Sequence, residues 1–192
     1  MTRPDRLPVA VLAVLSLAGC GQYLGDYTVE SVRVTTDVPI PEETSSHYGR
    51  FLEVSLVSDT SLTAISDEID GMYVDADFCP LHDVNGLIAF GPFSDEGIDL
   101  GFPSAAPPLR QGTDGRFRYR VYLPVSYQAQ AVTQLGQLQL PTYDLRQADG
   151  PVCLRFFAPG YNLFKSRSET FEVPADIIGA ALSSQPAAGG RR

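Results

Sequence analysis

The sequence predicts an all-β protein, an antiparallel β-sandwich of about seven to nine strands with little helix. Hydrophobic residues recur with a period of two, Asp-Gly and Asn-Gly pairs separate these segments, and 15 prolines, 17 glycines and no tryptophan disfavour long helices. The 192-residue chain is 44% hydrophobic and 19% charged, the balance of a folded domain rather than a disordered segment. We expect one domain, over residues 27–178.

Each strand rests on its own alternation of apolar and polar residues, typical of a strand with one face towards a core and one towards water. The alternating segments are 32–34, 52–56, 72–79, 116–123 and 152–157. The turn pairs are Asp70-Gly71, Asn85-Gly86, Asp114-Gly115 and Asp149-Gly150. Two further strands are expected at 86–90 and 168–173.

Other stretches interrupt this rhythm. We expect a polar loop at 36–49, a long irregular connection at 91–115 and a poorly paired ribbon or insertion at 126–142. Pro174 predicts a single helical turn, because proline suits the first position of a helix. Residues 179–192 are expected to form a disordered tail.

The first twenty residues have the order of an export signal. Arg3 and Arg6 precede an apolar run that is shorter than the roughly 20 residues needed by a membrane-spanning helix. The run ends in Leu17-Ala18-Gly19-Cys20, which closely resembles the lipobox of bacterial lipoproteins. The resemblance implies that residues 1–19 are removed as a signal peptide. It also implies that Cys20 is anchored to a membrane by a diacylglycerol on its sulfur and by acylation of its new amine. An ordinary signal peptide followed by an unmodified cysteine is the alternative.

Residues 20–26 are expected to form a short lipidated tether that keeps the domain close to the membrane. In Gram-negative lipoproteins, an aspartate after the lipidated cysteine commonly retains the protein at the inner membrane. This chain has Gly21 there, so the resemblance favours the outer membrane, facing the periplasm, in a host with two membranes.

Cys79 and Cys153 are the cysteines that follow Cys20, and in an exported protein such a pair predicts a disulfide. A metal or redox site is the minor alternative, because Cys79 and His82 offer just two ligands in one short segment.

The two cysteines also predict a strand pairing. If Cys79 lies opposite Cys153, then Asp77 faces Arg155 and Phe78 faces Leu154, so opposite charges meet on one face and apolar residues on the other. The competing arrangement is a bridge between two sheets, since Asp149-Gly-Pro-Val-Cys153 resembles the Asp-x-x-x-Cys of the immunoglobulin F strand. No tryptophan is present to pack on such a bridge.

The formal net charge of −9 disfavours nucleic-acid binding, which needs a basic surface. Acidic residues dominate residues 21–105, whereas basic residues outnumber acidic ones over residues 106–192. The candidate calcium ligands are Asp75, Asp77, Asp83 and Asn85, with a second acidic group at 95–99. The alternatives are attraction between the two halves and plain solvated acids.

A basic stripe is formed by Arg116, Arg118 and Arg120, which share one face of a predicted strand. It is a candidate docking surface for an anionic partner, such as a phosphate of lipopolysaccharide or an acidic protein. The alternative is the solvated face of a strand, paired with acids of its neighbours.

No recognisable catalytic or cofactor motif is present, and the sequence offers two histidines, His47 and His82, both in predicted loops. We therefore expect a non-enzymatic envelope lipoprotein without a cofactor. It would act in protein interaction or envelope architecture, held at the membrane by the lipid on Cys20. The alternatives are a carbohydrate- or calcium-binding module that uses loops 80–115, and an enzyme with an unrecognised carboxylate site.

Overall fold

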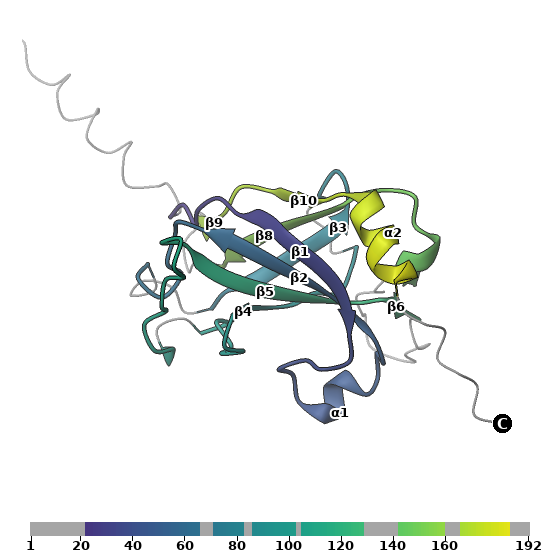
Figure 1. Ribbon diagram of the computed structural model, residues 1–192, viewed down its shortest axis with the longest axis horizontal. Coiled ribbons are helices and arrows are strands. Elements are labelled where there is room, and N and C mark those ends of the chain that lie inside the picture. The colour runs from purple at the N-terminus through teal and green to yellow at the C-terminus, as the bar shows by residue number, and fades with distance from the viewer. Residues whose placement is uncertain are drawn as a thin grey trace, which may run out of the picture.

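Two antiparallel sheets face each other across one apolar core in the computed structural model of the protein, which confirms the predicted β-sandwich (Figure 1). The structure describes residues 22–65, 71–82, 86–102, 105–128, 142–159 and 166–184. Seven strands in these ranges have three or more residues, within the predicted number.

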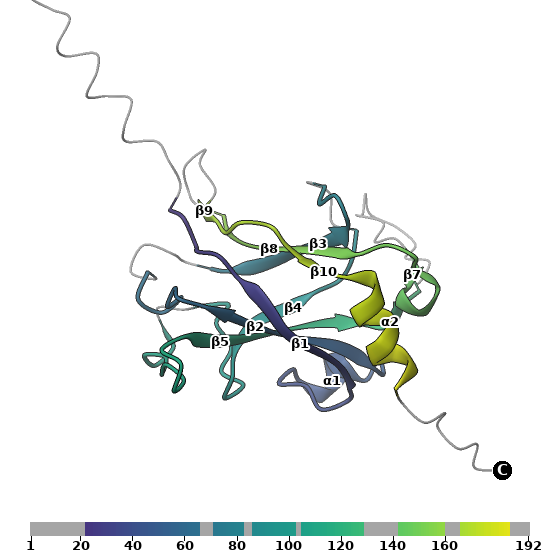
Figure 2. The same cartoon turned by 45° about the horizontal axis from the view of Figure 1, so that its top comes forward.

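The first sheet has the strand order β1-β2-β5-β4, made of β1 (Thr28–Thr35), β2 (Phe51–Ser58), β5 (Phe117–Pro124) and β4 (Phe90–Ser94). The second has the order β10-β8-β3, made of β10 (Phe171–Val173), β8 (Val152–Ala158) and β3 (Tyr73–Phe78), and β9 (Ser166–Arg167) also pairs with β8. A small ribbon joins β6 (Ser126–Tyr127) to β7 (Tyr143–Asp144), and a 3₁₀ turn, η3 (Leu145–Gln147), follows it. The helices are α1 (Glu42–Ser45) and α2 (Ala175–Ser183). Figure 2 shows the two layers nearly edge-on, with α2 at one end.

The core lies between the inner faces of the sheets. Its side chains come from the apolar positions of the predicted alternation: Leu52, Val54, Leu56, Tyr119, Val121, Leu123, Leu154 and Phe156, all completely buried. The Tyr119 hydroxyl donates to the Thr60 carbonyl at 2.6 Å and accepts from the Leu62 amide at 3.1 Å. Burial raises the pKa of this phenol, so it stays neutral and its polar atom is satisfied inside the core.

A second apolar cluster lies on the outer face of the first sheet, where the alternation predicts solvent. Phe51, Phe93 and Tyr122 are buried there beneath Val38, Ile40 and Tyr48 of the segment 36–49. The predicted polar loop is therefore a cover: it contains α1 and packs its apolar residues on the sheet.

The disulfide between Cys79 and Cys153 is present, with the two Cα atoms 5.0 Å apart. It joins β3 to its neighbour β8 within one sheet, so it is not the inter-sheet bridge of the immunoglobulin type.

The predicted register of these strands is wrong by two residues. Asp75, not Asp77, lies opposite Arg155, and Phe78 lies opposite Val152. The Cys79 amide donates to the Pro151 carbonyl, beyond the end of β3. A slip of two residues keeps every side chain on its face, so the hydrophobic pattern cannot distinguish the two registers.

Two predicted strands are displaced along the chain. The strand expected at 86–90 begins at Phe90 and continues to Ser94, through Gly91 and Pro92, so the irregular connection expected over 91–115 starts four residues later. Gly91 has a φ of +125° and lies where the register of β4 on β5 shifts, as at a β-bulge. The strand expected at 168–173 is divided into β9 and β10.

Both predicted boundaries of the domain are wrong. Residues 22–26 are not a tether, because Leu24 is completely buried in the core. The disordered tail predicted from residue 179 begins too early, since α2 continues to Ser183 and buries Ala181. Gly179 in the middle of this helix weakens its sequence signal. In the ribbon or insertion expected over 126–142, Ser126 and Tyr127 form β6, which pairs with β7 just after residue 142, while residues 129–141 lie outside the described ranges.

The register gives a testable energetic pair. A double-mutant cycle on Asp75→Asn and Arg155→Gln is expected to show a coupling of about 1 kcal/mol, because Arg155 Nη2 lies 2.6 Å from the Asp75 carboxylate and both side chains are largely buried. The measurement is urea unfolding of the wild type, both single variants and the double variant. The matched control cycle, Asp77→Asn with Arg155→Gln, is expected to show a coupling near zero. A larger coupling in the control cycle would favour the register predicted from the sequence, with Asp77 opposite Arg155.

Candidate functional site

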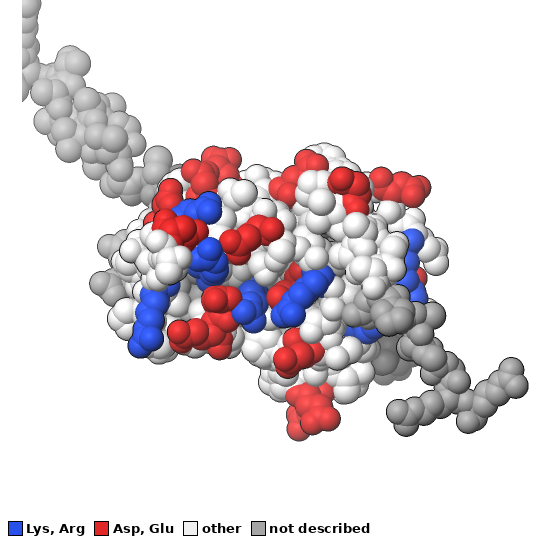
Figure 3. All heavy atoms as spheres, viewed as in Figure 1, with Lys and Arg blue, Asp and Glu red and all other residues white. Residues whose placement is uncertain are grey.

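The basic stripe on β5 is paired with acids of neighbouring segments. Arg118 Nη2 lies 3.2 Å from Glu30 Oε1 on β1 and 3.1 Å from Asp114 Oδ2, and Arg120 Nη2 lies 2.6 Å from Asp95 Oδ1. Arg116 Nε contacts Asp114 as well, at 3.2 Å. Figure 3 shows basic and acidic side chains interleaved over this face. The arrangement matches the alternative of a solvated strand face, with the charges engaged inside the domain.

A buried carboxylate adjoins this face, that of Glu53, and it was not among the predicted site residues; its partner, the Arg33 side chain, is exposed. Glu53 on β2 is 3% exposed, and its two carboxylate oxygens accept from Arg33 Nε at 2.8 Å and Nη2 at 2.9 Å. The carboxylate raises the pKa of Arg33, as expected for a charge-assisted pair. An acid inside the apolar run Phe51–Leu56, opposite an arginine on the preceding strand, was the available signal.

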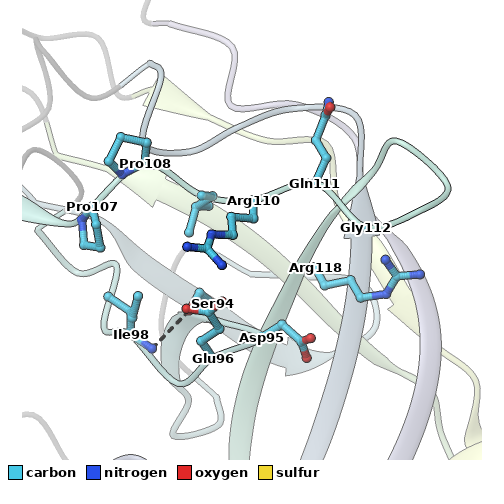
Figure 4. A pocket seen from close by; sticks show the side chains of 11 residues that line it. Ser94, Asp95, Glu96, Ile98, Pro107, Pro108, Arg110, Gln111, Gly112 and Arg118 are labelled. Carbon is cyan, nitrogen blue, oxygen red and sulfur yellow. Dashed lines mark hydrogen bonds between the residues drawn. The ribbon is translucent and has the colours of Figure 1, made fainter.

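A pocket of about 410 Å³ lies beside the paired arginines, between the turn after β4 and residues 107–112 (Figure 4). The Arg110 guanidinium points into it, towards Ser94 and Glu96. The Ser94 hydroxyl accepts a hydrogen bond from the Ile98 amide at 3.1 Å, which holds the turn. These loops belong to the predicted ligand-binding region 80–115, but the pocket lining contains no aromatic side chain among the described residues.

The aromatic side chains instead line a second hollow, of about 760 Å³, between α1 and β6. Tyr48 and Tyr127 face each other there with ring centroids 6.0 Å apart, and partial burial raises the pKa of Tyr48. Glu43, His47 and Gln128 add polar groups to the same walls. Aromatic faces beside hydrogen-bonding groups can hold a sugar ring or a peptide side chain.

Of the four calcium candidates, the structure describes Asp75 and Asp77, and both are paired within the domain. Asp75 is paired with Arg155, and Asp77 accepts hydrogen bonds from the Phe78 amide and from His82 Nδ1, both at 2.8 Å. Asp83 and Asn85 lie outside the described residues. Within the described ranges, one group of three metal-ligating residue types is close together, Cys79, Cys153 and Glu172, and its sulfurs form the disulfide.

Residues 22–24, which closely follow the candidate lipidation site Cys20, are hydrogen-bonded to β9 of the domain. The Gln22 amide donates to Ser166 Oγ at 2.9 Å, and the Gln22 carbonyl accepts from the Arg167 amide at 3.2 Å. The Leu24 amide donates to the Arg167 carbonyl at 3.0 Å. Cys20 itself lies outside the described residues, two positions before this fixed point. None of the described helices has the length and apolarity to cross a membrane.

The charged face generates a titration prediction. Hydrogen bonds from Arg118, and then from the Arg116 amide, lower the pKa of Asp114 to about 2. Because the folded pKa is depressed, the stabilisation by this carboxylate is present above its unfolded pKa near 4 and is lost as the pH falls towards 2. In an NMR titration, Arg118→Gln is expected to return the midpoint towards 4. Arg116→Gln, which keeps both the Arg118 bonds and the backbone donor, should leave most of the shift, and equal midpoints in the two variants would contradict the assignment.

No family model, curated protein or solved structure matches this chain. Its function is therefore inferred from three features of the molecule itself. These are the resemblance of Leu17-Ala18-Gly19-Cys20 to a lipobox, the attachment of residues 22–24 to β9, and the hollow between α1 and β6.

Proposed function

We propose that the protein is a lipid-anchored lipoprotein of the bacterial envelope whose β-sandwich acts by binding a partner rather than by catalysis. Two observations support the proposal. Leu17-Ala18-Gly19-Cys20 resembles a lipobox, and Gln22, two positions after Cys20, is hydrogen-bonded to Ser166 of the domain.

This short separation is the observation that carries the proposal. Two residues span at most about 7 Å, so a lipid on Cys20 holds one particular end of the sandwich at the membrane. We call this the entry end, defined by residues 22–24 and β9 (Figure 2). An unstructured tether would let the domain turn freely, whereas this attachment gives it an orientation.

The far end of the sandwich carries α1 and the ribbon of β6 and β7, because β1 and β5 lead the chain there from the entry end. The hollow lined by Tyr48 and Tyr127 therefore opens away from the membrane in the anchored protein. Rigid aromatic side chains in a partly buried setting are common anchors of protein interfaces. The hollow is the recognition site in this proposal, and Gly21 after the anchor favours the outer membrane, facing the periplasm.

The anchor is tested by mass spectrometry of the N-terminal peptide from membrane-purified protein. The wild type is expected to yield a peptide that begins at an acylated Cys20, and Cys20→Ser is expected to yield unmodified protein in the soluble fraction. Cys79→Ser with Cys153→Ser is the matched control, because it removes sulfur elsewhere and leaves the acylation in place. A wild-type peptide with an unmodified Cys20 would overturn the proposal.

Carbohydrate binding is the second candidate, favoured by the rings of Tyr48 and Tyr127 beside the polar groups of Glu43, His47 and Gln128. In an NMR titration with oligomers of N-acetylglucosamine, shifts are expected at Tyr48 and Tyr127. Tyr127→Ala should weaken the affinity by about tenfold through lost ring stacking. Tyr73→Ala, on the opposite sheet, is the matched control and should bind as the wild type does. Saturable binding that Tyr127→Ala leaves unchanged would exclude this hollow as the sugar site.

A further inference from the structure

A row of large side chains crosses the outer face of the second sheet at the entry end. Tyr23 forms a parallel bridge with Arg167, Arg167 pairs with Phe157 on β8, and Phe157 pairs with Tyr73 on β3. Residues directly paired across neighbouring strands point to the same face, so these four side chains lie side by side. With strands about 4.8 Å apart, the row is about 15 Å wide. We call it the aromatic row: Tyr23, Arg167, Phe157 and Tyr73.

The two tyrosines at the ends of the aromatic row are exposed to solvent, and Arg167 and Phe157 between them are half-buried. Tyr23 is 53% exposed and Tyr73 is 50% exposed, while Phe102, at the same end, is 63% exposed. Phe102 lies there because the neighbouring Gly101 carbonyl accepts from the Met72 amide, next to Tyr73. Of the four large hydrophobic side chains that are exposed in the described part of the chain, three are at this end, and the fourth, Ile177, is on α2. Such clustering indicates a surface that is covered in the working protein.

The position of the row identifies what covers it. Tyr23 is three residues after Cys20, so its backbone lies within about 10 Å of the proposed anchor. We propose that the aromatic row is a membrane-contact surface, which rests in the headgroup region of the bilayer that holds the lipid on Cys20. This inference rests on the proposed function, because the lipid is what brings the row to the bilayer.

The chemistry of the row suits this interface. Tyrosine places an apolar ring next to a polar hydroxyl, the combination found where hydrocarbon meets water. Tyr73 and Phe157 pack with ring centroids 5.6 Å apart and form one continuous apolar patch. Arg167 lies between this patch and Tyr23 on the same face of the sheet.

Nearby acids determine which headgroups the row accepts. The Tyr23 hydroxyl donates to the Asp26 carboxylate, and Glu169 is close enough to act on Tyr23 electrostatically. The chain also has a net charge of −9. Anionic lipids are therefore repelled at the edge of the row, and zwitterionic headgroups such as phosphatidylethanolamine are favoured.

The absence of tryptophan from the sequence makes a direct test possible. The lipidated protein is purified from membranes with one tryptophan, at Tyr73→Trp or Tyr23→Trp, and reconstituted in phosphatidylcholine–phosphatidylethanolamine vesicles. Part of the phosphatidylcholine carries bromine near the carbonyl end of its acyl chain and quenches tryptophan on contact. Mass spectrometry of the same samples determines whether Cys20 is acylated, and thermal unfolding confirms that each variant is folded.

Tryptophan at position 73 or 23 is expected to lose roughly half of its fluorescence to the bromines. Two controls distinguish contact from mere proximity. Thr113→Trp lies in the turn before β5, at the same end but on the other sheet, and Ile177→Trp is on α2. Both should keep their fluorescence.

The outcomes separate the two proposals. Acylated Cys20 with no quenching at positions 73 and 23, or with equal quenching at position 113, overturns the membrane-contact surface and leaves the anchor in place. Unmodified Cys20 overturns the anchor itself and the membrane-contact surface with it. Stronger quenching in vesicles rich in phosphatidylglycerol would contradict the preference for zwitterionic headgroups.

Discussion

The pairing of β3 with β8 is the constraint on which the second sheet depends. One register brings Asp75 to Arg155, places Tyr73 against Phe157 and carries the chain to the Cys79–Cys153 disulfide. A slip of two residues, to the register with Asp77 opposite Arg155, would still pair opposite charges but would move Tyr73 away from Phe157, although every side chain would stay on its own face. The disulfide closes a loop between cysteines 74 positions apart and restricts the unfolded chain. The pairing of β3 with β8 thus also determines the surface proposed to meet the membrane.

The first sheet differs from the second because side chains pack or pair on both of its faces. Its inner face supplies the core, and its outer face is divided between the cluster of Phe51, Phe93 and Tyr122 and a layer of ion pairs. Glu53 lies at the junction, with its charge balanced by Arg33. Burying a carboxylate without a partner would lower the stability of the fold, and the Arg33 guanidinium beside Glu53 offsets this cost. The charges of this face consequently serve the domain first.

The two ends of the sandwich differ in what they expose. At the entry end, backbone hydrogen bonds hold residues 22–24 against β9, and exposed aromatic side chains gather nearby. At the far end, α1 and β6 form the hollow with Tyr48 and Tyr127. An anchor at Cys20 would orient the sandwich, with the entry end resting on lipid headgroups and the far end presented to a partner. A long flexible tether would leave the same two surfaces without a defined direction.

The sequence by itself determined the fold class, the disulfide partners and the main core strands. Period-two alternation is a local property, so Leu52 to Leu56 and Phe117 to Leu123 could be assigned without knowledge of their neighbours. The resemblance to a lipobox is also local, and the export and the acylation of Cys20 that it implies stay predictions. Tertiary structure alone decided the register of β3, the burial of Leu24 and the hollow that residues 43–48 and 126–128 line together. The physical reason is that these features depend on which distant segments meet. Contacts between distant segments follow from the packing of the whole core, whereas the alternation within one strand predicts only which of its side chains face that core.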